Sequence, residues 1–521
     1  MKKTQLSLDN SLRMIFKTSV IIFIGLFLSK IFSYIYRIVI ARYLGAEIYG
    51  LFSLSIAIVG WFIAFASLGF VEGIIRYISF YRGKKDLKKI SYLYKLSSTT
   101  LLISTIFMAI LSFSLARLIS INIFHEPGLT IFLQIFSILI PFWIFATYFL
   151  NILRSFEKVE QQSFVENIIQ NFVKVAMLVL LILLGFKTNA VIFSFFAGIF
   201  AMFLAAFLYC KFKTPEIFKH TKLKSKSKKE VTRSFVSYSW PVMFFGIISS
   251  ALYWIDSIVL GIFKSATEVG FYNAIIPIAL LLNIAPGIFL QLLFPLITKE
   301  YSLKKFKVIK ESTKQIGKWI FVINLPFFIL MIIFPGAIIN VLFGAEYVIG
   351  SIALRFLLIG ALASSILIIS HNILSMLGRS RIILFDVLIA TILNIILNIW
   401  LVPKPLILGL DNSLGINGAA IATMISTLVL NLLFVIQAKH YMSIIPLRRK
   451  MVKILFISLI PLSFLLLVRK FIEIKILSAI IITIIFFLIY FALLLFFKAF
   501  DKNDLMILSG IKTKLKSITK L

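Results

Sequence analysis

The sequence predicts an all-α polytopic membrane protein with about 14 transmembrane helices, and three observations support this fold class. Hydrophobic residues make up 61% of the 521 residues and the mean hydropathy is +1.05, a composition that soluble globular domains do not have. Apolar runs long enough to span a bilayer recur along the whole chain. Most of the 54 lysines and arginines fall in every second segment between these runs, as the positive-inside rule requires.

The expected spans follow one another through short connections that leave no room for a soluble domain. They lie near residues 14–40, 48–70, 93–118, 129–150, 162–185, 189–209, 235–262, 272–297, 317–335, 351–376, 382–402, 415–437, 452–468 and 475–497. The charge distribution places both termini in the cytoplasm and the protein in the cytoplasmic membrane. It also argues against a nucleic-acid partner, because the net charge of +34 is concentrated in the expected cytoplasmic segments.

A recurring offset of about 220 residues predicts an internal duplication. Residues 49–53 (YGLFS) correspond to residues 269–273 (VGFYN), and shorter matches near His125 and Asn151 keep the offset. Six helices per copy give both copies the same orientation, so we expect two parallel six-helix repeats, the N- and C-lobes, around a central cavity. The expected domains are an N-lobe (1–210), a basic cytoplasmic linker (211–233), a C-lobe (234–440), and a C-terminal helix pair with a basic tail (441–521).

Metal and cofactor chemistry has no candidate in this sequence. Cys210 is the only cysteine, and the four histidines are scattered without ligand spacing. The glycine-rich phosphate loop G-x-x-x-x-G-K-[S/T] does not occur. We therefore expect no metal, no cofactor and no catalytic residues.

Charged and amide side chains inside the spans form the candidate site, because contact with lipid would be costly for them. Lys30 and Arg37 share one face of the first helix, and Asp256 lies in the helix that opens the second repeat. One interpretation is a basic, hydrated cavity for an anionic headgroup, with arginine binding phosphate through two hydrogen bonds. The other is a set of interhelical ion pairs and hydrogen bonds that hold the bundle together. The candidate substrate-cavity residues are Lys30, Arg37, Lys174, Arg355, Asp256, Asn167, Asn171 and Asn394.

Carboxylates in or near the spans are candidates for ion coupling, since a carboxylate at membrane depth can bind a proton or Na⁺. These candidates are Asp256, Glu166 and Asp386, with Glu72 as a further carboxylate. The residues alone do not choose between ion coupling and the membrane potential as the driving force.

Four segments carry a family resemblance: ARYLGAEIYGLFSLSIAI (41–58), IDSIVLGIFKSATEVGFYNA (255–274), LFGAEY (342–347) and GINGAAIAT (415–423). In their order they resemble the polysaccharide-flippase branch of the multidrug/oligosaccharidyl-lipid/polysaccharide exporter superfamily. The resemblance covers essentially the whole chain. It implies two lobes around a central cavity that opens to alternate sides of the membrane.

The resemblance also implies a function: export of a lipid-linked oligosaccharide, carried on a polyprenyl phosphate or diphosphate, for surface polysaccharide or glycan assembly. In the related lipid II flippases, basic residues of the first helix line the cavity, and Lys30 and Arg37 lie in a comparable stretch. The expected partners are the lipid-linked glycan, membrane lipids, and glycosyltransferases or a polymerase of the same pathway.

Two other functions compete with a flippase. A cation-coupled multidrug antiporter of the same superfold would favour an acidic cavity, yet basic residues outnumber acidic ones in the expected spans. A membrane glycosyltransferase or polymerase would need catalytic carboxylates at a membrane face and a sizeable outer loop, and the sequence offers neither. We therefore expect a transporter and not an enzyme.

Overall fold

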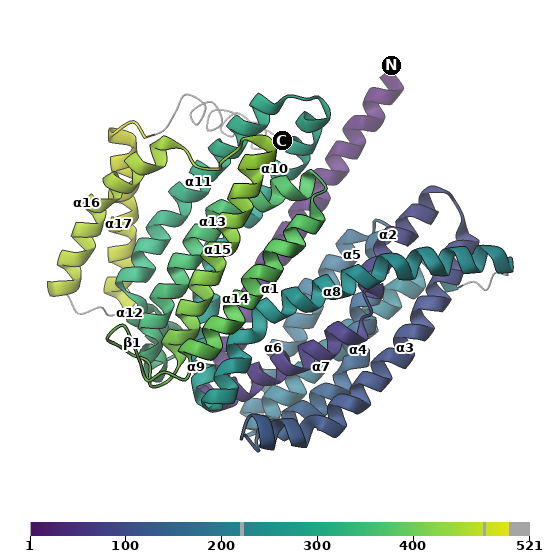
Figure 1. Cartoon of the computed structure of the whole chain (residues 1–521), viewed down its shortest axis with the longest axis horizontal. Helices are drawn as coiled ribbons and strands as arrows, with labels where there is room; N and C mark the ends of the chain where they lie inside the picture. The colour runs from purple at the N-terminus through teal and green to yellow at the C-terminus, as the bar shows by residue number, and fades with distance from the viewer. Residues whose placement is uncertain (1, 219–222, 472–475, 500–521) are drawn as a thin grey trace. The chain divides into compact units, whose positions relative to one another are not determined.

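The computed structural model describes residues 2–218, 223–471 and 476–499, and this part of the chain is almost entirely helical (Figure 1). It forms two compact units. Unit 1 comprises Met1–Ala274 and Asn394–Ala419, and unit 2 comprises Ile275–Leu393 and Ala420–Leu521. These units are not the lobes expected from the sequence, whose boundaries at 211–233 stay a prediction. The all-α fold class is confirmed.

Unit 1 holds the first part of the chain and a short β-hairpin. Its elements are α1 (Lys2–Ala66), α2 (Phe70–Gly83), α3 (Leu87–Leu118), the π-helix η1 (Ile119–Ile123), α4 (Leu129–Ser155), α5 (Val159–Ser163), the π-helix η2 (Phe164–Ile169), α6 (Gln170–Leu183), α7 (Thr188–Lys213), the 3₁₀ turn η3 (Pro215–Phe218), α8 (Ser225–Phe263), most of α9 (Ala266–Leu280), and the antiparallel strands β1 (Leu406–Ile407) and β2 (Leu410–Asp411).

Helices are the regular secondary structure of unit 2 among its described residues, and α9, α14 and α15 each contribute to both units. Its elements are the 3₁₀ turn η4 (Leu281–Asn283), α10 (Ile284–Ser302), α11 (Phe306–Ile333), α12 (Pro335–Leu342), the 3₁₀ helix η5 (Ala345–Gly350), α13 (Ser351–Met376), α14 (Ser380–Leu401), α15 (Ile416–Met442), α16 (Arg449–Phe471) and α17 (Ile476–Phe496).

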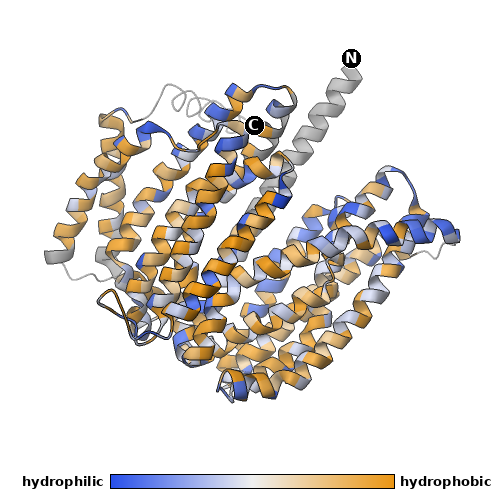
Figure 2. Ribbon diagram, in the orientation of Figure 1, coloured by the Kyte–Doolittle hydropathy of each residue, from blue (hydrophilic) through white to orange (hydrophobic). Residues whose placement is uncertain are grey.

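Twelve helices among the described residues are long and apolar enough to cross a membrane, and Ile481–Phe496 is a shorter apolar helix. Figure 2 shows hydrophobic residues along the helices and hydrophilic residues gathered near many helix ends and connections. The protein is therefore a multi-pass membrane protein. The first two expected spans lie in α1, on either side of Gly45, so the expected count of 14 stays a prediction.

Gly45 interrupts α1, and glycine is required there. Its backbone angles, φ 87° and ψ 172°, belong to a region that only glycine adopts readily. The sequence repeat places the equivalent interruption between α8 and α9, which end and begin at Phe263 and Ala266. The two copies of the expected turn therefore break their helices at corresponding positions.

These two turns pack directly against each other within unit 1. A Cβ atom added to Gly50 would lie 1.7 Å from the Ala266 carbonyl oxygen, and one added to Gly270 would lie 2.0 Å from the Ala46 oxygen. Ala46 and Ala266, like Gly50 and Gly270, are related by the offset of 220 residues. The contact is therefore reciprocal, as a local twofold relation between the two copies would produce, and glycine allows the backbones to approach.

Glycines also join α2 to α8. A Cβ atom at Gly69 would lie 2.1 Å from the Ser239 carbonyl oxygen, and one at Gly73 would lie 2.6 Å from the Ser239 hydroxyl oxygen. The Phe70 and Phe235 rings pack beside this contact with their centroids 4.6 Å apart. Helix α8 begins at Ser225 and continues to this contact, so the expected linker is helical from Ser225 onward. Residues 219–222 of the linker lie outside the described part of the chain.

Unit 2 contains a helix break next to a proline. The 3₁₀ turn η4 separates α9 from α10, three residues before Pro286. Pro286 has no N–H, so the Leu282 carbonyl lacks its usual helical partner. The Asn324 side-chain amide of α11 donates to that carbonyl at 2.7 Å. A side chain thereby replaces the lost backbone hydrogen bond in a bundle where water is scarce.

Candidate functional site

A cavity of about 570 Å³ opens among the helices of unit 1. Its walls come from α1, α2, α4, the segment Val159–Ile169 and α8. The space exists because two of the walls carry small side chains. These small residues are Gly60, Ala64 and Ser67 near the end of α1, and Gly246, Ser249 and Ser250 on α8. A Cβ atom added to Gly246 would meet no atom within 4 Å, so the cavity would accept a side chain there.

The α4 wall presents one helix face to the cavity. Trp143, Thr147, Asn151 and Arg154 recur at spacings of three and four residues, which places them on one side. The Trp143 ring packs against Phe195 of α7 at 5.6 Å between centroids, and the Asn151 amide donates to the Val71 carbonyl at 2.8 Å. These contacts orient the wall before any ligand binds.

Carboxylates face the same cavity. Glu166 lies in the π-helix η2 and accepts a hydrogen bond from Gln162 at 3.1 Å. A single π-helical turn within a longer helix often occurs at a functional site. Glu72 enters from the first turn of α2. Although Glu72 is accessible to solvent, the surrounding helices raise the pKa of its carboxyl above the ordinary value, because they remove part of its hydration.

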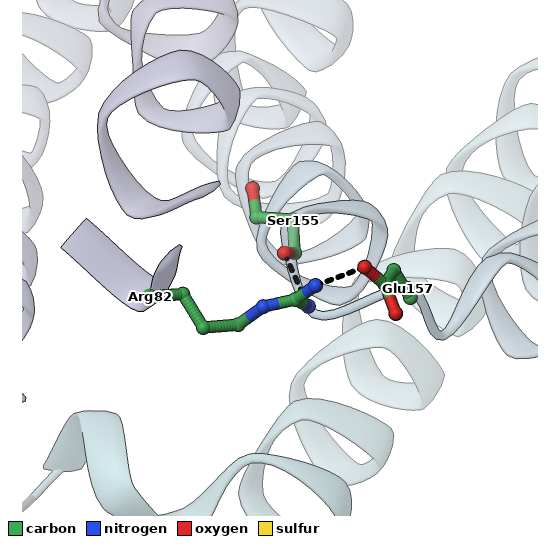
Figure 3. A network of polar contacts seen from close by, with 3 residues as sticks. All are labelled: Arg82, Ser155 and Glu157. Atoms are coloured by element: carbon green, nitrogen blue, oxygen red, sulfur yellow. Dashed lines mark hydrogen bonds and ion pairs between the residues drawn. The ribbon is translucent and has the colours of Figure 1, made fainter. Parts of the chain in front are cut away.

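An arginine connects the ends of α2 and α4 next to this wall (Figure 3). The Arg82 guanidinium donates to the Ser155 carbonyl at 2.7 Å and forms an ion pair with Glu157. The Glu157 side chain is 81% exposed, so this ion pair adds little to stability. The hydrogen bond from Arg82 instead fixes the position of Ser155, the residue that follows Arg154 of the cavity wall.

Arg37 lies outside the lining of this cavity, beside the break in α1. Its guanidinium donates to the Tyr49 hydroxyl at 3.0 Å, and that hydroxyl donates to the Asn273 carbonyl at 3.1 Å. In a straight helix Arg37 and Tyr49 would lie ~18 Å apart along the axis, at ~1.5 Å per residue. The break at Gly45 therefore brings them together. Arg37 is half-buried and Tyr49 is fully buried.

Lys174 and two of the expected amides form a second polar group in unit 1. The Lys174 ammonium donates to the Asn171 side-chain oxygen at 3.1 Å and lies 4.8 Å from the centre of the Tyr36 ring. Asn171 donates to the Ser29 hydroxyl of α1 at 3.1 Å, and Asn167 donates to Ser163 at 3.0 Å. The contacts of Lys174 and Asn171 connect α6 to α1, whereas the bond of Asn167 connects η2 to the adjoining α5.

Asp256 accepts hydrogen bonds from three side chains and is only 6% exposed. The donors are the Tyr272 hydroxyl at 2.7 Å, the Asn398 amide at 2.8 Å and the Asn394 amide at 3.5 Å. Among the described residues, the Asn398 side-chain oxygen is buried and has no hydrogen-bond partner. A carboxylate beside an amide oxygen could hold a proton or a small hard cation.

The offset of 220 residues relates these two groups. Tyr36 corresponds to Asp256, and Lys174 corresponds to Asn394. In the structure Lys174 contacts Tyr36, and Asn394 contacts Asp256. The two related pairs carry opposite charge: Lys174 lies over an aromatic ring in the first, and Asp256 lies among amides in the second. The internal duplication stays a prediction.

The remaining candidates lie apart from these groups. Lys30 is exposed on α1. Arg355 and Asp386 belong to unit 2, where the Arg355 side chain donates to the Ile332 carbonyl at 3.2 Å and Asp386 is buried. Of the candidate ion-coupling carboxylates, Glu166 lines the cavity. A role in one common substrate space stays a prediction for Arg37, Lys174, Arg355 and Asp256.

Trp143, Thr147 and Arg154 line the cavity and were not among the residues predicted from the sequence. A signal for them was present, because polar residues recur at helical spacing at Thr147, near the end of the fourth expected span, and at Asn151 and Arg154 just beyond it. The small residues that create the space, Gly60 and Gly246, gave a weaker signal. Small residues in membrane helices more often mark close packing than a cavity.

Comparisons with known proteins identify related chains. The family model described as polysaccharide biosynthesis protein matches residues 15–301, and the MatE model matches residues 241–400. The chain is 24% identical to a putative O-antigen transporter of Shigella flexneri, over 66% of this chain and 80% of that protein. It is 26% identical to a probable low-salt glycan biosynthesis flippase of Haloferax volcanii, over 53% and 54%.

A further relative shares a smaller part of its length. An uncharacterized membrane protein of Methanocaldococcus jannaschii is 30% identical over 38% of this chain and 37% of that protein. The chain therefore spans little more than a third of this relative and about half of the Haloferax protein. The two relatives whose names state an activity are a transporter and a flippase, in agreement with the expectation that the chain is not an enzyme.

Solved structures share the fold. The lipid II flippase MurJ in an inward closed conformation aligns with a TM-score of 0.71 at 19% identity, over 92% of this chain and 99% of that chain. An inward-facing multidrug resistance MATE transporter aligns with a TM-score of 0.61 at 14% identity, over 80% and 94%. The family match covers more than half of the residues. The chain therefore belongs to the polysaccharide biosynthesis protein family, within the multidrug/oligosaccharidyl-lipid/polysaccharide exporter superfamily.

Proposed function

We propose that the protein is an alternating-access flippase that moves a lipid-linked oligosaccharide across the cytoplasmic membrane. The substrate is a sugar chain on a polyprenyl phosphate or diphosphate, destined for a surface polysaccharide or glycan. One observation carries this proposal: a polar cavity lies within membrane-spanning helices of a chain from the polysaccharide biosynthesis family. A glycan headgroup cannot cross ~30 Å of hydrocarbon unaided, whereas the lipid tail can remain in the bilayer.

The proposed partners follow from this substrate. They are the lipid-linked glycan itself, the surrounding membrane lipids, and glycosyltransferases or a polymerase of the same pathway. We also propose that both termini lie in the cytoplasm, because the basic segments between the spans alternate along the sequence.

For the phosphate end of the substrate we propose Arg37, together with Lys30, Lys174 and Arg355. Arg37 is the best placed, since one guanidinium nitrogen is held by Tyr49 while the side chain remains only half-buried. A guanidinium fixed in this way can donate two parallel hydrogen bonds to a phosphate.

For coupling we propose Asp256, Glu166 and Asp386 as sites where a proton or Na⁺ binds. Asp256 has the strongest support, because its carboxylate is buried among polar side chains that two separate helices provide. Binding of a cation would neutralise the carboxylate and change its hydrogen bonds with α9 and α14. Such a change at the junction of helices is a plausible step between two states.

A cation-coupled multidrug antiporter is the second candidate, and one observation favours it. The cavity lining contains two carboxylates, Glu72 and Glu166, against one guanidinium, Arg154. An acidic cavity would suit an organic cation. The family match over residues 15–301 and the polarity of the lining favour the glycan substrate.

Arg37→Ala is expected to lower lipid-linked oligosaccharide translocation in proteoliposomes about 10- to 100-fold, the effect of losing one or two charge-assisted hydrogen bonds. Arg37→Lys should restore part of the rate, because lysine keeps the charge and lacks the planar fork. Translocation is measured with a fluorescent glycolipid whose outer-leaflet fraction is quenched by dithionite.

Arg117→Ala is the matched control, since Arg117 is exposed on α3 and has no proposed role. Size-exclusion profiles establish that each variant is folded. A folded Arg37→Ala protein that translocates the glycolipid at the wild-type rate would refute the proposed phosphate contact.

A further inference from the structure

The charge of the unit 1 cavity does not suit a phosphate. Two carboxyl groups, Glu72 and Glu166, and one guanidinium, Arg154, line it, so acidic groups outnumber basic ones. Two carboxylates beside a bound phosphate or diphosphate would repel it electrostatically. The proposed phosphate-binding Arg37 lies outside this lining. The cavity is therefore chemically suited to a different part of the substrate.

The cavity lining includes several hydrogen-bond acceptors. The Asn151 amide nitrogen is engaged by the Val71 carbonyl at 2.8 Å, and that of Gln162 by Glu166 at 3.1 Å. These bonds fix the orientation of both amides, so each amide oxygen remains an acceptor and each NH₂ group keeps a second N–H donor. Together with the Glu72 and Glu166 carboxylates, they form a lining that suits a ligand rich in O–H donors.

Trp143 adds a flat apolar surface to the same wall. Phe195 supports the indole from α7 at an angle of 59° between the rings, while Trp143 itself lines the cavity. A sugar ring has an apolar face of C–H groups and an edge of hydroxyl groups. An indole beside carboxylate and amide oxygens matches both parts of a sugar ring.

We propose that this cavity is a glycan subsite, in which neutral sugar units of the substrate stack on Trp143 and donate hydroxyl hydrogen bonds to Glu72 and Glu166. The inference rests on the proposed flippase function and adds to it the division of the headgroup: sugars in the unit 1 cavity, phosphate outside it. The volume of about 570 Å³ falls within the range of small-molecule sites and has room for more than one sugar ring.

Binding of a neutral free trisaccharide tests the subsite without transport. Saturation-transfer NMR with the full-length protein in nanodiscs measures the affinity for triacetylchitotriose. Trp143→Ala and Glu166→Gln are each expected to weaken binding about tenfold, as the loss of a stacking surface or of a charged acceptor does. The matched controls Trp240→Ala and Glu160→Gln, which lie outside the lining, should bind as wild type does.

Gly246→Leu provides a second variant should Trp143→Ala fail to fold. A Cβ atom at position 246 meets no atom within 4 Å, so a leucine side chain starts in open space and extends into the cavity. The subsite predicts that this variant folds and loses trisaccharide binding. Unchanged binding in folded Gly246→Leu and Glu166→Gln proteins would overturn it. Binding of tetraphenylphosphonium that Glu166→Gln abolishes, with no trisaccharide binding by wild type, would overturn it in favour of an organic-cation site.

A transport arm separates this inference from the proposed function. Proteoliposomes are loaded with a polyprenyl diphosphate trisaccharide or with the sugar-free polyprenyl phosphate, and the ratio of their translocation rates is compared. Trp143→Ala and Glu166→Gln should lower this ratio about tenfold. A wild-type ratio in both variants would reject the subsite and leave the flippase intact. Failure of the wild-type protein to move either lipid would reject the flippase, while trisaccharide binding would still decide the subsite.

Discussion

Gly50→Ala is expected to prevent stable folding of the protein. The added methyl group would lie 1.7 Å from the Ala266 carbonyl oxygen and 2.9 Å from the Gly270 nitrogen. Both are backbone atoms, so no side chain can turn away and the two helices must separate. We expect a loss of at least about 3 kcal/mol, at the upper end of the range for overpacking. The yield of monodisperse protein and the midpoint of thermal unfolding in detergent measure the effect.

Two further variants, one on the reciprocal side of the contact and one control, complete this experiment. Gly270→Ala should be equally damaging, because its Cβ atom would lie 2.0 Å from the Ala46 oxygen on the reciprocal side of the contact. Gly287→Ala is the control, since a Cβ atom at Gly287, also within a helix, meets nothing within 4 Å. A Gly50→Ala protein with the same yield and unfolding midpoint as Gly287→Ala would show that the turns do not pack this closely.

Asp256→Ala is expected to destabilise the protein and abolish transport. Its removal deletes the buried hydrogen bonds from the Tyr272 hydroxyl and from one N–H of Asn398, and the loss of a buried hydrogen bond to a charged group costs about 1–3 kcal/mol. Asp256→Asn keeps the shape and removes the charge. If Asp256 binds the coupling ion, this variant should fold and bind the lipid-linked substrate while ion-driven translocation stops.

Asp411→Asn is the matched control for Asp256→Asn, because Asp411 lies in the exposed hairpin and its side chain accepts hydrogen bonds from its near neighbour Ser413. Thermal unfolding, substrate binding and translocation are measured on the same preparations. Wild-type transport by a folded Asp256→Asn protein would exclude Asp256 from coupling and leave it a structural role.

The sequence was sufficient for the parts of the fold that depend on composition and local pattern. Hydropathy located the spans, and the echo of residues 49–53 in 269–273 located two equivalent helix breaks. It did not indicate that the two breaks pack against each other. An offset relates positions within each copy, and contact between copies depends on how the helices dock. Gly50 and Gly270 allow that approach without specifying it.

The candidate site was less accessible from the sequence than the fold. Placing polar residues inside spans identified the groups around Asp256 and Lys174, because buried polar atoms need partners wherever the helices run. The contact of Arg37 with Tyr49 depends on the backbone of Gly45, which a count of residues does not supply. The cavity forms where small side chains leave space between helices, and the sequence does not show which residues surround that space. Its acidic lining therefore could not be predicted from the excess of basic residues in the spans.

One measurement addresses the central claim, that this chain moves a glycan-bearing lipid. The wild-type protein is reconstituted into proteoliposomes that contain a fluorescent polyprenyl diphosphate oligosaccharide, and a parallel set is loaded with ethidium. With an ion gradient and a membrane potential imposed, we predict protein-dependent transfer of the glycolipid between leaflets and no accelerated loss of ethidium. Ethidium export without glycolipid transfer would contradict the claim and identify the chain as a cation exporter.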